Sequence, residues 1–257
     1  PALAAFQRAQ RVVDDALEKD GALAGLVLMR SDIQGRTGLL HFYLRDLDKS
    51  IACYNEALRI LEHAPDLDAH ELAVRKVRLF NNIAGVYIQR EDYATALPYF
   101  QQAMVINEPL KEPRNEGSLN NNIGICLMET GEHDRANEYF LKSLAVRKEL
   151  GDGRGQAQVL NNLGKNQVYF GHFDAARERF EQALAIGREI ESRESMVISL
   201  ESLSSIYDTL GNYKAALGAQ REFKTLNDTL YNAGTRQTIA RLEEEFRRDK
   251  ERELFQA

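Results

Sequence analysis

The sequence contains no tryptophan, only two cysteines and only five prolines, and no segment alternates between apolar and polar residues as a half-buried strand would. The few prolines and the missing alternation favour an all-helical chain. No apolar run approaches the roughly 20 residues needed to cross a bilayer, because the longest covers only residues 22–29. No signal peptide is recognisable and the first residue is Pro1 rather than methionine, so we expect the sequence to be part of a longer protein.

The sequence also lacks an excess of positive charge, since it has 33 basic and 39 acidic residues and a net charge of −6. Binding to nucleic acid needs a clustered basic surface, so we expect no nucleic-acid partner. The cysteines, Cys53 and Cys126, fall two repeat units apart, too far to form a disulfide, and we expect two buried thiols. Unpaired thiols favour a reducing compartment such as the cytoplasm, although a periplasmic sensor domain stays open.

The chain does have an internal repeat, with a period of 40 residues. Two asparagines followed by Ile or Leu and then Ala or Gly occur at residues 81–84, 121–124 and 161–164. Self-similarity at such a period predicts a solenoid of stacked units. The same register extends to five units, each with a small residue in its first helix: Gly38, Ala84, Gly124, Gly164 and Ser204.

A second series in this register places an aromatic ring in the second helix of the first four units. Small residues let two helices approach closely, while a ring can fill the wedge between neighbouring hairpins. Gly131, Gly171 and Gly211 fall between the two helices of their units, where a left-handed residue ends a helix at little steric cost. The ring series consists of Tyr54, Phe100, Phe140 and Phe180, and it breaks at Gln220.

This pattern resembles the tetratricopeptide repeat (TPR), with its small-residue, aromatic and Ala–aromatic–Ala positions. The usual unit of that family is about 34 residues long. The longer period is similar to the long-helix branch of kinesin light chains, Leu-Gly-Asn repeat proteins and bacterial peptide-sensing regulators. The resemblance covers roughly residues 22–227. It implies an all-α fold, a right-handed α-solenoid of helical hairpins (a TPR superhelix).

The resemblance also implies how the chain is divided. We expect an N-terminal capping helix at residues 1–21 and a charged C-terminal helix at residues 228–257. Five TPR units are expected between them, at approximately residues 22–66, 67–111, 112–152, 153–191 and 192–227.

The expected C-terminal helix combines a narrow apolar seam of Ile239, Leu242 and Phe246 with a densely charged face. Such a helix suits a segment that leaves the solenoid or forms a short coiled coil. It resembles the tail of bacterial sensor proteins, in which TPR units lead to a membrane anchor and an output module. The alternative, a capping helix folded back on the repeats, stays open.

The resemblance further implies which residues face a ligand, since the first helices of TPR proteins line the concave surface. Asparagine amides both donate and accept hydrogen bonds, so a ladder of them can pair with the backbone of an extended peptide. One asparagine of each pair could instead bond to the neighbouring unit, and the sequence does not say which. The predicted peptide- or partner-binding residues are Arg78, Asn81, Asn82, Asn121, Asn122, Glu129, Gln158, Asn161, Asn162, Lys165, Tyr169 and Ser202.

No catalytic residue, metal site or cofactor is predicted. None of the five histidines pairs with another at i,i+3 or i,i+4, and the glycine-rich residues 151–155 lack the Gly-Lys-Ser/Thr ending of a phosphate loop. We therefore predict a non-catalytic module that binds a protein or peptide segment, as the input or assembly domain of a larger bacterial signalling regulator. One alternative is a scaffold that forms a homodimer through residues 228–257. A phosphatase-like regulator ranks last, because residues 1–21 are too short for the N-terminal helical bundle that it would need.

Overall fold

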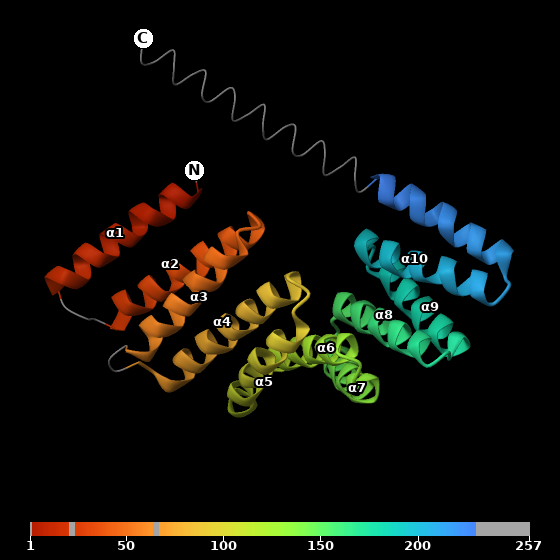
Figure 1. Cartoon of the computed structure of the whole chain (residues 1–257), viewed down its shortest axis with the longest axis horizontal. Helices are drawn as coiled ribbons and strands as arrows, with labels where there is room; N and C mark the ends of the chain where they lie inside the picture. The colour runs from red at the N-terminus through yellow and green to blue at the C-terminus, as the bar shows by residue number, and fades with distance from the viewer. Residues whose placement is uncertain (1, 21–23, 64–66, 230–257) are drawn as a thin grey trace, which may run out of the picture. The chain divides into compact units, whose positions relative to one another are not determined.

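The computed structural model describes residues 2–20, 24–63 and 67–229, and in these ranges the protein consists of α-helices joined by short turns, with no β-strand (Figure 1). Residues 213–229 are also helical, up to the last described residue. The prediction of an all-α chain is confirmed. The helices are α1 (Ala2–Asp20), α2 (Ala24–Tyr43), α3 (Leu47–Glu62), α4 (Ala69–Gln89), α5 (Tyr93–Leu110), α6 (Pro113–Glu129), α7 (His133–Glu149), α8 (Gly153–Tyr169), α9 (Phe173–Glu189) and α10 (Arg193–Thr209).

The described residues form two compact units, an N-terminal unit within residues 1–150 and a C-terminal unit within residues 151–257. In the N-terminal unit α2 packs against α3, α4 against α5 and α6 against α7, while α1 packs against α2. Successive hairpins of this unit meet where α3 contacts α4 and α5 contacts α6. In the C-terminal unit α9 packs against both α8 and α10. The finer division into five repeat units and a cap stays a prediction.

The turn inside each hairpin contains one residue in the left-handed region. Glycine holds this position in the later hairpins, at Gly131 with φ 87°, Gly171 with φ 73° and Gly211 with φ 74°. Arg45 and Glu91 adopt the same conformation in the first two hairpins. Because a residue with a Cβ atom adopts positive φ less readily than glycine, only the later turns were recognisable from the sequence.

In the hairpins that contain Gly124 and Gly164, this glycine of the first helix lies directly against an aromatic ring of the second helix. A Cβ atom added to Gly124 would lie 2.7 Å from Phe140, and one added to Gly164 would lie 2.5 Å from Phe180. Both rings are almost fully buried, with exposed fractions of 0% and 1%. In these two hairpins the ring of the second helix thus lies on the side that faces the first helix.

The last hairpin departs from this arrangement where the ring series breaks. Gln220 is exposed, whereas Phe223 packs one turn later against the cluster that contains Leu203 and Ala219.

No helix among residues 2–20, 24–63 and 67–229 has the length and apolar character needed to span a membrane. The predicted charged helix at 228–257 falls, except for its first two residues, outside the described part of the chain.

Candidate functional site

The N-terminal unit carries two adjoining pockets between its first helices, α2, α4 and α6. The α2–α4 pocket has a volume of about 320 Å³ and the α4–α6 pocket has a volume of about 250 Å³. Arg78 of α4 lines both pockets, so they meet at this side chain. We call the surface formed by the two pockets the first-helix face. Its lining residues are Asp32, Gly35, Arg36, Leu39, Val74, Val77, Arg78, Leu79, Asn81, Asn82, Asn115, Ser118 and Leu119.

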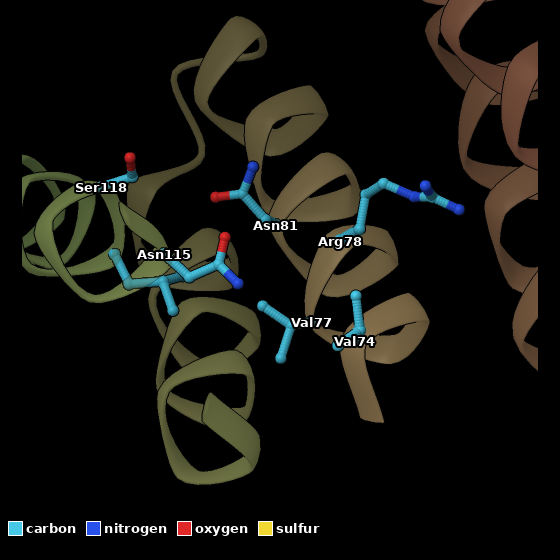
Figure 2. A pocket seen from close by; sticks show the side chains of 7 residues that line it. Val74, Val77, Arg78, Asn81, Asn115 and Ser118 are labelled. Carbon is cyan, nitrogen blue, oxygen red and sulfur yellow. The ribbon is translucent and has the colours of Figure 1, made fainter. Parts of the chain in front are cut away.

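The α4–α6 pocket combines apolar walls with amide side chains. Figure 2 shows Asn81 on α4 and Asn115 on α6 extending into the space between the two helices, with Val77 beside them. Arg78 points to the other side of α4, away from Asn115 (Figure 2). Pockets with apolar walls and a few polar groups of fixed position are typical of ligand sites.

The first asparagine of the second and third predicted pairs is buried. Asn121 has an exposed fraction of 1% and donates from Nδ2 to Oδ1 of Asn122 over 3.3 Å. Asn161 has an exposed fraction of 3% and accepts from Oγ of Ser199 on α10 over 3.1 Å. Side chains this buried cannot reach a ligand, so Asn121 and Asn161 hold the packing of α6 and α8 in place.

The second asparagine of each pair, by contrast, is only half-buried. Asn82 lines the α2–α4 pocket, and Asn122 donates from Nδ2 to Oδ1 of Asn81 over 3.4 Å. That bond links α6 to α4 beside the α4–α6 pocket. Asn162 is likewise half-buried on α8. Asn81 differs from Asn121 and Asn161, because it is the first member of its pair and still lines a pocket.

The remaining predicted residues do not line either pocket. Glu129 is exposed at the last residue of α6. In the C-terminal unit Gln158, Lys165 and Tyr169 are exposed on α8. Ser202 on α10 is partly buried and donates its hydroxyl to the Ile198 carbonyl of its own helix over 3.1 Å.

The charges of the first-helix face centre on Asp32. Its Oδ1 accepts from Arg75 at 2.5 Å and from Arg78 at 2.8 Å. Arg75 also binds Glu71 at 3.0 Å, and its side chain is only 17% exposed. Burial by itself would lower the pKa of Arg75, but the hydrogen bonds to Asp32 and Glu71 raise that pKa above its ordinary value. Arg75 and Asp32 therefore form the fixed part of this cluster.

Several residues of the face were not recognised from the sequence, and helical spacing could have indicated some of them. Asn115 precedes Asn122 by seven residues, which is two turns on the same side of α6. Val74 stands four residues before Arg78, and Val77 stands four residues before Asn81, which is one turn in each case. No sequence signal distinguishes Asp32 or Arg36, because their importance follows from the packing of α2 against α4.

No group of three or more histidine, cysteine or acidic side chains is arranged to hold a metal ion in the described parts of the chain. Cys126 is buried, and burial raises the pKa of its thiol to about 12. A thiol with so high a pKa is a poor nucleophile at neutral pH.

Comparison with known families gives four matches, each described as a tetratricopeptide repeat. The matched segments are residues 32–60, 78–108, 115–189 and 161–228. No curated protein matches the sequence.

Solved structures share the fold at low sequence identity. BtubC (BKLC) from P. vanneervenii has a TM-score of 0.73 and 19% identity, over 89% of this chain and 91% of that protein. A Rap protein complexed with Competence and Sporulation Factor has a TM-score of 0.65 and 21% identity, over 83% of this chain and 58% of the Rap chain. The Rap conjugation gene regulator of plasmid pLS20, in complex with the Phr* peptide, has a TM-score of 0.66 and 17% identity, over 80% of this chain and 56% of the regulator chain.

The chain therefore spans less than two thirds of the length of either Rap protein. At these identities the likeness concerns the fold, which is an all-α solenoid of helical hairpins. The predicted fold class is confirmed.

Proposed function

We propose that the N-terminal unit binds an extended peptide segment on the first-helix face. The chain belongs to the tetratricopeptide-repeat family, in its long-repeat branch, and its fold is that of a protein-interaction module. The observation that carries the proposal is the pair of pockets that meet at Arg78 and expose asparagine amides beside apolar walls. The role proposed is binding without catalysis.

The amides suit the backbone of an extended peptide. A peptide unit presents one donor and one acceptor, and an asparagine side chain offers both in return. Asn82 and Asn115 lie on different first helices, and each lines a different pocket. Backbone bonds to such amides would fix the peptide across α4 without selecting its side chains.

The apolar walls add a second kind of contact. Val74, Val77 and Leu119 line the α4–α6 pocket, whose volume of about 250 Å³ has room for one aliphatic side chain. Burying such a side chain contributes about 1.5–3 kcal/mol. We propose that this contribution supplies much of the affinity, while the amides set the path of the peptide.

The fold relatives support a peptide as the ligand. The pLS20 Rap regulator was solved in complex with the Phr* peptide, and another relative is a signal-transduction ATPase with a tetratricopeptide-repeat sensor from Pyrococcus horikoshii. We propose that this chain serves as the input or assembly domain of a larger signalling protein. Gln158, Asn162, Lys165 and Tyr169 of the C-terminal unit stay predictions as contact residues.

A randomised peptide library displayed on phage tests the proposal, followed by titration of the enriched peptide. We expect the double variant Asn82→Ala/Asn115→Ala to bind that peptide about thirtyfold more weakly, since each of the two lost hydrogen bonds contributes about 1 kcal/mol. Both side chains line pockets rather than the hairpin core, so the thermal melting temperature should change little.

Asn55→Ala provides the matched control, because Asn55 is exposed on α3, a second helix of the same unit. Binding of the peptide by this variant should equal that of the wild type. The proposal is wrong if no peptide is enriched, or if the double variant binds as tightly as the control.

A further inference from the structure

We infer that the segment bound on the first-helix face is acidic, and that an Asp or Glu side chain of the ligand binds between Arg36 and Arg78, taking Arg78 from Asp32. This inference rests on the proposed function and names the chemistry of its ligand. Its basis is that Asp32, Arg36 and Arg78 line the α2–α4 pocket, while Arg75 binds Asp32 from outside the lining.

Arg78 is placed to change partners. Its side chain is 58% exposed and lines both pockets, so a bound peptide that crosses α4 must pass it. Its only ion pair with a described residue is the one to Asp32. An ion pair with so exposed an arginine contributes little to stability, so its exchange for a ligand carboxylate costs little.

Asp32 does not lose its compensation when Arg78 leaves. Both arginines bind the same Oδ1 atom, and Arg75 is the closer and the more buried of the two. Asp32 therefore keeps a short, charge-assisted hydrogen bond to Arg75 after the exchange. The carboxylate has two cationic partners and needs only one.

Arg36 supplies the second cation for the incoming carboxylate. It is exposed on α2, lines the same pocket as Arg78, and forms no hydrogen bond or ion pair with any residue that the structure describes. An arginine guanidinium presents several donors in a planar fork that matches a carboxylate. A carboxylate between Arg36 and Arg78 would thus find donors from both α2 and α4.

The charge balance of the face also favours an anion. The chain as a whole carries a net charge of −6. The two pockets are nevertheless lined by two arginines and a single carboxylate, which is already bound by Arg75. A basic ligand would have to draw Asp32 away from two arginines and approach Arg36, which makes it the disfavoured alternative.

The test uses a random heptapeptide library fused to phage at its C-terminus, so that only side chains offer carboxylates. Peptides selected on the wild-type chain should be enriched in Asp and Glu over Lys and Arg. Changing the acidic residue of the best peptide to its amide should weaken binding by about fivefold, the upper range for an exposed ion pair. The same change should have almost no effect on binding to Arg36→Gln/Arg78→Gln.

Asp32→Asn gives the sharpest outcome, because it removes the competing carboxylate. We expect this variant to bind the acidic peptide about two- to threefold more tightly at low salt, with the gain reduced as salt screens the charges. Arg36→Gln has no described partner to lose, so it keeps the test valid even if Asp32→Asn folds poorly. Lys148→Gln, at an exposed site on α7, is the control and should leave binding unchanged.

The outcomes separate this inference from the proposed function. Enriched peptides without an acidic preference, or tighter binding after the acid is changed to its amide, overturn the inference and leave peptide binding intact. Weaker binding by Asp32→Asn also overturns it, because Asp32 would then contact the ligand directly. If no peptide is enriched, both the inference and the proposed function are wrong.

Discussion

At the scale of single residues, three of the hairpins contain a glycine that faces a ring, at Gly38, Gly124 and Gly164. An alanine at residue 164 would place its Cβ atom 2.5 Å from Phe180, closer than two non-bonded carbon atoms can approach. Because Phe180 is buried among its neighbours, it has no space into which to move.

We therefore expect Gly164→Ala to lower the free energy of unfolding by about 1–3 kcal/mol, as is usual when a packed core is overfilled. Gly218→Ala is the matched control in the same unit, because nothing lies within 4 Å of the added Cβ atom. That variant should be neutral or gain about 0.5–1 kcal/mol, since alanine favours a helix over glycine. Urea denaturation of both variants measures the difference, and equal stabilities would contradict the account of the packing.

The buried thiol of Cys126 predicts how stability depends on pH. Burial raises its pKa from 9.0 to about 12 in the folded chain. The unfolded chain therefore loses this proton at lower pH, so the contribution of the neutral thiol is complete below pH 9 and is lost as pH rises towards 12. We expect the urea midpoint to fall between pH 9 and pH 12, and to fall less steeply in Cys126→Ala. Parallel curves for the two proteins would show that this thiol is not responsible.

Residue-scale features could be predicted from the sequence only in part. The register of the repeat identified the facing glycines and rings, because small residues and rings recur at fixed positions, as at Gly124 with Phe140 and Gly164 with Phe180. It could not say that Asn121 is buried while Asn82 and Asn122 are half-exposed. Adjacent residues of a helix point only about 100° apart, so the choice between them depends on where the neighbouring helix lies.

At the scale of the helices, aspartate side chains define where several of them begin. Asp46, Asp68, Asp92 and Asp152 each stand at the N-cap and accept a hydrogen bond from a backbone N–H three residues later. The first turn of a helix has free N–H groups, and an acidic side chain there satisfies one of them. The cap before α5 therefore helps to set the turn between α4 and α5.

Removing one such cap gives a direct test. We expect Asp92→Ala to lower the free energy of unfolding by about 1 kcal/mol, because the Thr95 N–H loses its bond of 3.1 Å. Glu112→Ala is the control, since Glu112 stands at the N-cap of α6 without a side-chain hydrogen bond to the helix. Its stability should stay within experimental error of the wild type, and a loss as large as that of Asp92→Ala would contradict the role given to the cap.

The helix scale also explains why Asn115 was missed. The Asn-Asn pairs predict a site in the middle of each first helix, whereas α6 begins at Pro113 and Asn115 lies in its first turn. The pocket exists because the start of α6 packs beside α4, and the distance between two helices is not encoded in the spacing along either one. A sequence pattern fixes the side of a helix on which a residue lies, but not the size of the hollow beside it.

At the scale of the whole molecule, the period of the repeat was sufficient to predict an all-α solenoid. Within each unit the hairpins pack mainly against their neighbours in sequence, so local patterns carry most of the architecture. The separation into an N-terminal and a C-terminal unit was not predictable, because the repeat pattern continues through residue 150 without interruption. The site was not predictable from the sequence either, because its pockets form between helices whose packing the repeat pattern does not specify.

The most direct test of the peptide-binding proposal is a crystal structure of the chain with the peptide enriched from the random library. We predict that the peptide runs over α2, α4 and α6, with its backbone bonded to the amides of Asn82 and Asn115 and one aliphatic side chain beside Val77. A peptide bound instead on α3, α5 and α7, with both asparagines in contact with water alone, would contradict the proposed function.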